Sequence, residues 1–262
     1  VLTVHFVLSL PLNPAPVVVG LVTFAVYAGD RIADAEDDEL SSPERSAFVT
    51  RHRRLLSVLT AGTYGLAIAL SITGGPLALG ITLLPGAFWI LYASEWLPTL
   101  GSYFKRLKRI LVVNSAIVAL AWAIAVVGLP MAFAEASVTA LTGVVFVYLF
   151  VDTFVNTEIP NVRDVEADEA VGVSTIPVVF GIRRTRHVLY GLDLSLIAFV
   201  GAALVSGVVS TPVAAAILLG LGYALVLAWF VGRSATPGRL AIAGEAKHLV
   251  VFALLLVFTA GV

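Results

Sequence analysis

Two clusters of acidic residues have the types and spacing that could carry chemistry in this chain. The first is a series of aspartates four residues apart: Asp30, Asp34 and Asp38. The second has offsets of three and four: Asn161, Asp164 and Asp168. Because an α-helix has about 3.6 residues per turn, each cluster is predicted to share one helical face.

Carboxylates gathered in this way favour a divalent cation. Like charges held close together are costly unless a cation lies between them. Mg²⁺ takes oxygen ligands and usually binds through one or two carboxylates together with substrate phosphates. Two such faces could hold a pair of Mg²⁺ ions around a diphosphate. The metal and nearby basic side chains would stabilise the charge that grows on a departing pyrophosphate.

The alternative interpretation is that these acids are only solvated at a membrane edge. Two clusters, both at helical spacing and both flanked by basic residues, favour the metal site. The remaining acids of the two segments point away from the shared faces and are interpreted as solvated: Glu36, Asp37, Glu39, Glu166 and Glu169.

The composition indicates which elements must position these clusters. Apolar residues make up 59% of the 262 residues and charged residues only 13%, against about 25% charged in soluble domains. The mean hydropathy is +1.00. The net charge of −1 gives no case for a nucleic-acid partner, and the absence of cysteine excludes disulfides and thiolate metal sites. No loop can hold a soluble domain, so we expect residues 1–262 to form a single transmembrane domain.

Spanning a bilayer takes about 20 apolar residues, and eight stretches of that kind are present: 15–33, 54–73, 76–94, 110–130, 136–157, 187–207, 211–232 and 246–262. A ninth, at residues 1–10, would rise only about 15 Å. We expect it to be a first helix that lacks its N-terminal half. A signal peptide is disfavoured, because no basic segment precedes the stretch and no small-residue cleavage site follows it. The prediction is an all-α membrane bundle of nine helices, the first incomplete.

The basic residues predict the orientation of this bundle. All 16 fall in or beside four of the connections: Arg31, Arg45, Arg51, Arg53 and Arg54; Lys105, Arg106, Lys108 and Arg109; Arg163, Arg183, Arg184 and Arg186; Arg233, Arg239 and Lys247. The positive-inside rule places these connections in the cytoplasm. We therefore expect a multi-pass protein of the cell membrane with both acidic clusters on the cytoplasmic side.

At these residues the chain resembles the UbiA superfamily of intramembrane prenyltransferases. That family has nine transmembrane helices, an NDxxDxxxD-type motif after helix 2 and a DxxxDxxxD- or DxxxDxxxG-type motif after helix 6. The more specific match is the run that starts at Asn161 and reads Asn-Val-Arg-Asp-Val-Glu-Ala-Asp, followed by Gly172 and by Thr-Ile-Pro177. Asp30 stands where the family usually has Asn, and Arg31 where it often has Asp, which puts a metal-binding role for position 31 in doubt.

The resemblance implies transfer of a polyprenyl group from its diphosphate to a lipophilic acceptor. It implies that Mg²⁺ is held by the four catalytic aspartates Asp34, Asp38, Asp164 and Asp168, with Asp30 in support. Asn161 would hydrogen-bond the same cluster and the diphosphate. Lys108 is the first candidate for a direct contact with the diphosphate, and Arg45 is the second. The alternative is that these two residues only contribute to the positive charge of the cytoplasmic loops. A quinone precursor, a glycerol-phosphate lipid, a carotenoid and a tetrapyrrole all stay open as acceptors.

Two polar residues inside the sixth apolar stretch are further candidates. Asp152 lies one turn before Asn156, on a face that leads toward Asn161. Ionisable groups at this depth are rare and functional by default, so the pair could bind the acceptor or balance the cation. The alternative is an interhelical hydrogen bond, and for Asp193 the structural interpretation is favoured.

Two other functions compete with prenyl transfer. In a transporter, Asp152 and Asp193 would form a cation path, but a transporter places its key acids near the midplane, whereas most acids here lie at the cytoplasmic edge. A phosphotransferase of the CDP-alcohol type also uses aspartates and a divalent metal. Its compact D-x-x-D-G-x-x-A-R motif is absent from this sequence.

Overall fold

The computed structural model describes residues 1–33, 35, 43–93, 113–170, 172–234 and 236–260. All regular elements in these ranges are helical. The chain divides into two compact units, which are treated separately below. Unit 1 contains Val1, Leu10–Leu107 and Ile124–Ser137, and unit 2 contains Leu2–Ser9, Lys108–Ala123 and Val138–Val262.

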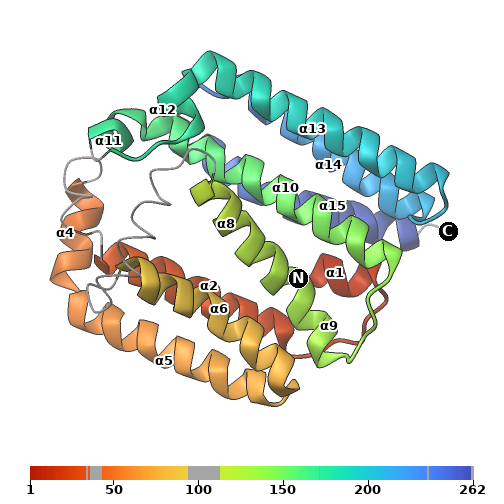
Figure 1. Cartoon of the computed structure of the whole chain (residues 1–262), viewed down its shortest axis with the longest axis horizontal. Helices are drawn as coiled ribbons and strands as arrows, with labels where there is room; N and C mark the ends of the chain where they lie inside the picture. Colours follow the sequence, from red (N-terminus) through yellow and green to blue (C-terminus); the bar gives the residue numbers. More distant parts are fainter. Residues whose placement is uncertain (34, 36–42, 94–112, 171, 235, 261–262) are drawn as a thin grey trace. The chain divides into compact units, whose positions relative to one another are not determined.

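Unit 1 is built on three long helices that pack against one another: α2 (Ala15–Ala33), α5 (Arg53–Ile72) and α6 (Gly75–Ala93) (Figure 1). The short helix α9 (Leu129–Phe133) packs on α2 and α6. Asn13 ties the start of α2 to this region, because its side-chain amide donates to the Pro130 carbonyl at 3.0 Å while its oxygen accepts from the Ala15 amide at 3.0 Å.

The contact between α5 and α6 depends on the small size of Gly86. A Cβ at this position would overlap the Tyr64 hydroxyl. That hydroxyl donates to the Thr82 carbonyl on α6 at 3.2 Å. Small residues allow helices to approach closely in lipid, and here the approach also gives a tyrosine a hydrogen-bond acceptor on the neighbouring helix.

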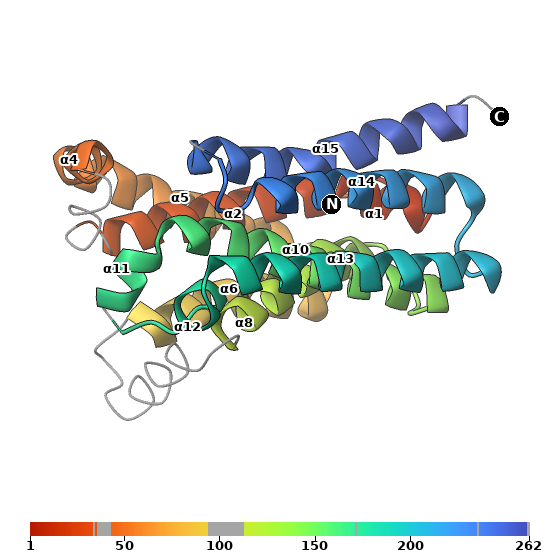
Figure 2. The ribbon, with the colours of Figure 1, turned by 90° about the horizontal axis from the view of Figure 1, so that it is seen from above.

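Unit 2 contains four long helices: α10 (Ala140–Arg163), α13 (Ile182–Val205), α14 (Thr211–Phe230) and α15 (Pro237–Ala260). They pack in the order α10–α13–α14–α15, and α15 also packs on α10 (Figures 1 and 2). Helix α8 (Val113–Ala123) lies against α10, and α1 (Leu2–Val7) lies against α15. A buried apolar cluster around Val155 and Leu189 joins α10, α13 and the end of α14.

Helix α10 carries the second acidic motif. It begins at a capping box in which Thr139 and Thr142 each accept from the other's backbone amide. Its 24 residues rise about 36 Å, which exceeds the roughly 30 Å of bilayer hydrocarbon. The polar end with Asn161 can therefore extend past the apolar layer, where charged groups are tolerated.

The predicted all-α membrane protein is confirmed by this architecture. Among the described residues, seven helices are long and apolar enough to cross a membrane, and an eighth apolar stretch at Gly75–Ala87 is shorter. The predicted count of nine is not confirmed by this criterion.

Two predicted spans differ from the observed helices. A π-helical turn (Ile124–Gly128) follows α8 and precedes Pro130. Proline lacks an amide proton and disturbs a regular helix at this point, which hydropathy alone does not register. Helix α15 begins at Pro237, well before the predicted start at residue 246. Glu245 and Lys247 interrupt the apolar run but are good helix formers.

Candidate active site

The second acidic motif lies at a break between two helices of unit 2. Helix α10 ends at Arg163, Asp164 follows it, and α11 (Val165–Ala170) then begins. The single continuous helical face expected from the sequence is thus interrupted at Asp164. The Asp168 amide still donates to the Asp164 carbonyl at 2.8 Å, so the two aspartates remain one helical turn apart.

Asp164 is held by its neighbour in the sequence. The Arg163 guanidinium donates to both carboxylate oxygens of Asp164, each at 2.6 Å. Such a bidentate pair fixes the carboxylate plane as well as its charge. Both side chains are partly exposed, at 38% and 31%, so the pair lies where solvent or a substrate can reach it.

Asp168 faces inward on the same turn. The Thr175 hydroxyl donates to its Oδ2 at 3.4 Å, and the Val173 amide donates to its backbone carbonyl at 2.8 Å. Gly172 adopts a φ of +71°, which a residue with a side chain rarely adopts and which lets the chain fold back from α11. Burial and the nearby charge of Asp164 raise the pKa of Asp168 to about 6.

The loop that carries Thr175 is anchored by an apolar side chain. Ile176 opens the short helix α12 (Ile176–Phe180) and is 3% exposed. It packs with Ala119 of α8 and Phe154 of α10. The Thr-Ile-Pro run is therefore a structural part of the motif, because burying Ile176 holds Thr175 beside Asp168.

Glu158 is a further acid at this end of α10 that the sequence reasoning did not single out. Glu158 is completely buried. The side chains of Ser115 and Asn161 and the Ile176 amide lie near its carboxylate, but none forms a hydrogen bond of good geometry with it. Its charge also reaches Asp168. The signal that could have found it is an ionisable residue inside an apolar helix, three positions before Asn161.

Deeper in unit 2, Asp152 is paired with a lysine from another helix. The Lys247 Nζ of α15 lies 2.5 Å from Asp152 Oδ1, with exposures of 1% and 0%. Lys247 also donates to Asn156 Oδ1 at 3.3 Å, and the Asn156 amide donates to the Gly244 carbonyl at 3.4 Å. Asp152 and Asn156 were candidates from the sequence alone, whereas their partner Lys247 was not identified there.

Asp193 joins this group from α13. It is completely buried and lies within electrostatic reach of both Lys247 and Asp152. Neither of its carboxylate oxygens has a hydrogen-bond partner among the described residues. The contacts of Asp152 and Asn156 with Lys247 join α10 to α15. This is the kind of contact between helices that was the alternative to a role in acceptor binding.

The first acidic motif begins on unit 1. Asp30 is exposed on the last turn of α2, while Asp34, Asp38 and the predicted diphosphate ligand Lys108 lie outside the described residues. Arg45 is on helix α4 (Pro43–Arg51). The neighbouring Ser46 donates to the Ala35 carbonyl at 2.6 Å, so α4 is tied to the segment that follows α2.

Comparison with known proteins decides the family. The sequence profile described as the UbiA prenyltransferase family matches residues 5–251. The chain belongs to this family. It is a prenyltransferase, and with its apolar helices it is an integral membrane protein.

Solved structures with a UbiA-type fold agree with this assignment. A UbiA homolog from Archaeoglobus fulgidus bound to DMAPP and Mg²⁺ has a TM-score of 0.62 at 16% identity, covering 97% of this chain and 92% of the other. A digeranylgeranylglyceryl phosphate synthase has a TM-score of 0.59 at 14% identity, covering 94% and 84%. No curated protein sequence matches the chain.

The residues of the second UbiA motif fit a divalent cation. Within the described ranges no three His, Cys, Asp or Glu side chains come together as a complete metal cage. Mg²⁺ needs no such cage, because it commonly binds one or two carboxylates and takes its other oxygens from substrate phosphates and water. Asp164 and Asp168, one turn apart at a polar helix end, supply that kind of partial ligand set.

Proposed function

We propose that the chain catalyses Mg²⁺-dependent transfer of a polyprenyl group from its diphosphate to a lipophilic acceptor, with release of pyrophosphate. The observation that carries the proposal is the turn from Asp164 to Asp168. It presents two carboxylates, one of them with a raised pKa, beside the Thr175 hydroxyl. Carboxylates crowded in this way favour bridging by a cation.

Residues of both acidic motifs take part in the proposed binding of Mg²⁺ and the diphosphate. In this proposal Asp34, Asp38, Asp164 and Asp168 would hold Mg²⁺, with Asp30 in support. Asn161, Lys108 and Arg45 contact the diphosphate. We expect the Arg163 guanidinium, which already donates to Asp164, to balance phosphate charge as well.

The chemistry follows from these assignments. The bond between the allylic carbon and the diphosphate oxygen breaks, and its electron pair leaves with pyrophosphate. Bound Mg²⁺ supplies the positive charge that stabilises this leaving group. A nucleophilic carbon or oxygen of the acceptor then attacks the allylic cation, and the proton that it loses passes to the released pyrophosphate or to water. Quinone precursor, glycerol-phosphate lipid, carotenoid and tetrapyrrole acceptors all satisfy this scheme.

Asp152 and Asn156 keep their place in the proposal as acceptor-side candidates. Both are now seen to be engaged within the chain, by Lys247 and by the Gly244 carbonyl. An acceptor could reach either group only by displacing one of these contacts. Their contribution to acceptor binding is therefore expected to be smaller than that of the aspartates to Mg²⁺ binding.

The deciding experiment is a prenyl-transfer assay in membranes. Labelled geranylgeranyl diphosphate is supplied with a panel of acceptors, with and without Mg²⁺. Asp164→Asn and Asp168→Asn are expected to lower transfer about a hundredfold or more, because each removes charge from the site where the leaving group develops. Removal of Mg²⁺ is expected to abolish transfer by the unaltered chain.

The matched controls are two acids on the same helix. Glu166→Gln and Glu169→Gln remove exposed carboxylates of α11 and are expected to leave transfer within about twofold. Equal losses in all four variants would indicate a general effect of charge at this helix. Full activity of Asp168→Asn would contradict the metal assignment, provided that each variant inserts at the level of the unaltered chain.

A further inference from the structure

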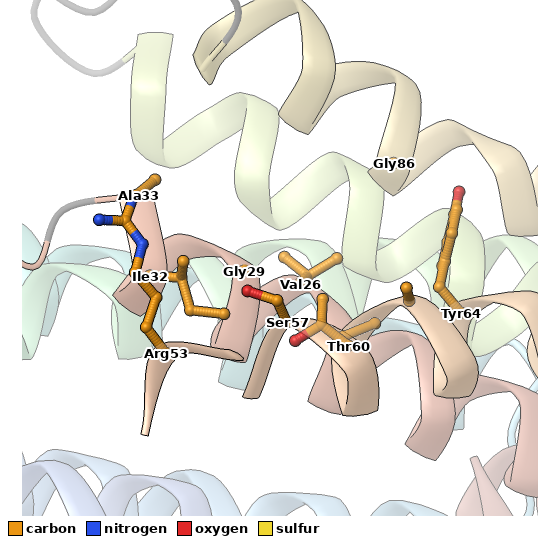
Figure 3. A pocket seen from close by; sticks show the side chains of 11 residues that line it. Val26, Gly29, Ile32, Ala33, Arg53, Ser57, Thr60, Tyr64 and Gly86 are labelled. Atoms are coloured by element: carbon orange, nitrogen blue, oxygen red, sulfur yellow. The ribbon is translucent and has the colours of Figure 1, made fainter. Parts of the chain in front are cut away.

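Unit 1 contains a cavity whose lining residues have no role in the proposed reaction. It has a volume of about 480 Å³ and lies where α2, α5 and α6 meet (Figure 3). Gly29, Ile32 and Ala33 of α2 form part of its apolar wall. Its size falls within the range of pockets that hold small organic ligands, roughly 300–1,000 Å³.

Helix α5 lines this cavity with a polar stripe. The members are spaced by four, three and four residues: Arg53, Ser57, Thr60 and Tyr64. Figure 3 shows them in this order along α5, with the Arg53 guanidinium beside Ala33 and Tyr64 near Gly86. At about 1.5 Å per residue, the stripe extends about 16 Å from the end of the helix.

The middle of the stripe has unused hydrogen-bonding capacity. The Thr60 hydroxyl is buried and has no partner among the described residues. On the same helix the Thr63 hydroxyl donates to the Leu59 carbonyl at 2.8 Å, the usual arrangement for threonine in an apolar helix. Because the Thr60 oxygen is also closed off from the cavity, the exposed Ser57 one turn away is the hydroxyl that a ligand can reach.

The outer end of the stripe carries positive charge. Arg53 is the first residue of the α5 span, and Arg51 and Arg54 beside it are also exposed. Helix α5 is the least buried of the seven candidate spans, with 11% of its apolar window inside the protein. Exposed apolar side chains such as Leu55 and Val58 lie on the same helix, so this helix has the character of one that contacts lipid.

We propose that this cavity binds one chain of an anionic phospholipid from the surrounding bilayer, with the lipid phosphate at the Arg53 guanidinium. Arginine is suited to phosphate because its planar group can donate two parallel hydrogen bonds. Ser57 lies about 6 Å deeper along the helix, at the level where a phospholipid carries its ester carbonyls below the phosphate. The Ser57 hydroxyl donates to an ester oxygen, and the chain lies against α2 and α6.

Charge and polarity both favour this occupant over a neutral lipid. A neutral isoprenoid or carotenoid would leave the Ser57 hydroxyl without an acceptor and Arg53 without a counter-charge. An anionic phospholipid supplies a phosphate, ester oxygens and an apolar chain in the order in which the cavity presents their partners. The proposal concerns lipid binding alone and does not depend on the catalytic assignments.

The experiment is native mass spectrometry of the full chain in detergent after lipid removal, titrated with dioleoyl phosphatidylglycerol or dioleoyl phosphatidylcholine. The unaltered chain is expected to retain one phosphatidylglycerol at least about fivefold more strongly than phosphatidylcholine. Arg53→Gln is expected to remove this preference. Ala61→Phe, which fills the cavity from α5, is expected to lower retention of both lipids.

Matched controls come from the same helix. Arg54→Gln removes an exposed neighbouring charge, and Ala69→Phe adds the same bulk at an exposed position that does not line the cavity. Both are expected to bind like the unaltered chain, and melting temperatures without added lipid check that every variant folds. If Ala61→Phe fails to fold, Ser57→Val tests the same contact and is expected to weaken phosphatidylglycerol retention.

Three results would overturn the proposal. Equal losses in Arg53→Gln and Arg54→Gln would show that diffuse surface charge attracts the lipid. Displacement of phosphatidylglycerol by inorganic phosphate alone would show a headgroup site without a chain site. Displacement of phosphatidylglycerol by equimolar geranylgeranyl diphosphate, together with loss of both ligands in Arg53→Gln, would show that the cavity binds the prenyl donor.

Discussion

At the residue scale, unit 2 contains charged side chains in an unusual place. Lys247, Asp152 and Asp193 come from three different membrane helices and are almost completely excluded from solvent. A buried ion pair is weak evidence for net stabilisation, because desolvating both charges is costly. Removing Lys247 is different, since it leaves the buried Asp152 with only His248 Nε2, 3.5 Å from its Oδ2, as a basic neighbour.

We therefore predict that Lys247→Met lowers the free energy of unfolding by about 3–5 kcal/mol. The double variant Asp152→Asn/Lys247→Met is expected to recover part of this loss, because the uncompensated carboxylate is removed as well. The measurement is denaturant or thermal unfolding of the purified chain in detergent micelles.

Arg239→Met provides the control for this prediction, because Arg239 is an exposed cation near the start of the same helix. It is expected to change stability by less than about 0.5 kcal/mol. A Lys247→Met variant as stable as the unaltered chain would show that the pair makes no net contribution at its buried position.

At the element scale, helix contacts in this chain depend on particular glycines. In α14, a Cβ at Gly220 would overlap Cγ2 of Val251 on α15, whereas Gly222 on the same helix has no atom within 4 Å of that position. Composition alone does not distinguish these two glycines. The neighbouring helix decides which one is required for close packing.

This pair of glycines yields a matched prediction. Gly220→Ala is expected to destabilise the chain by about 1–3 kcal/mol, because valine is stiff at χ1 and the α14–α15 contact must open. Gly222→Ala is expected to be neutral or stabilising by up to about 1 kcal/mol, since alanine is the better helix former. Melting temperatures of both variants in the same detergent give the comparison, and equal shifts would contradict the packing argument.

The breaks between elements matter as much as the helices themselves. The second motif works as a turn between α10 and α11, closed by Gly172 and anchored by Ile176. A strictly continuous helix would carry Thr175 away from Asp168. The interruption at Asp164 keeps the two aspartates one turn apart while bringing the Thr175 hydroxyl back to them.

At the scale of the whole molecule, the family assignment and the apolar helices establish an integral membrane enzyme. Its expected orientation rests on 15 of the 16 basic residues, which lie in or beside connections that the positive-inside rule assigns to the cytoplasm. Lys247 is buried within α15 and does not bear on the orientation. The proposed active site would then open toward the cytoplasm, where water-soluble pyrophosphate can leave.

Single cysteines test this orientation cleanly, because the chain has no cysteine of its own. Glu169→Cys lies in the second acidic motif and Ser137→Cys in a connection without basic residues, and both positions are exposed. In intact cells, a membrane-impermeant maleimide is expected to label Ser137→Cys and not Glu169→Cys. Inverted membrane vesicles are expected to give the opposite result, and labelling of both variants from one side would contradict the orientation.

The sequence by itself determined the class of the protein and the positions of its motifs. Mean hydropathy and the length of the apolar runs are local properties, so they are readable without a fold. The Asp164–Asp168 spacing is likewise local, because helical periodicity relates residues one turn apart. The resemblance carried by Asn161 to Pro177 led to the family that the sequence profile then confirmed.

Only the tertiary structure decided which distant residues meet. Asp152 and Lys247 are 95 positions apart in the sequence, and no periodicity connects α10 with α15. The burial of Glu158 and the cavity beside α5 likewise depend on neighbouring helices. Hydropathy reports the average environment of a segment, whereas a contact depends on which face of each helix is turned toward the other, and packing sets that rotation.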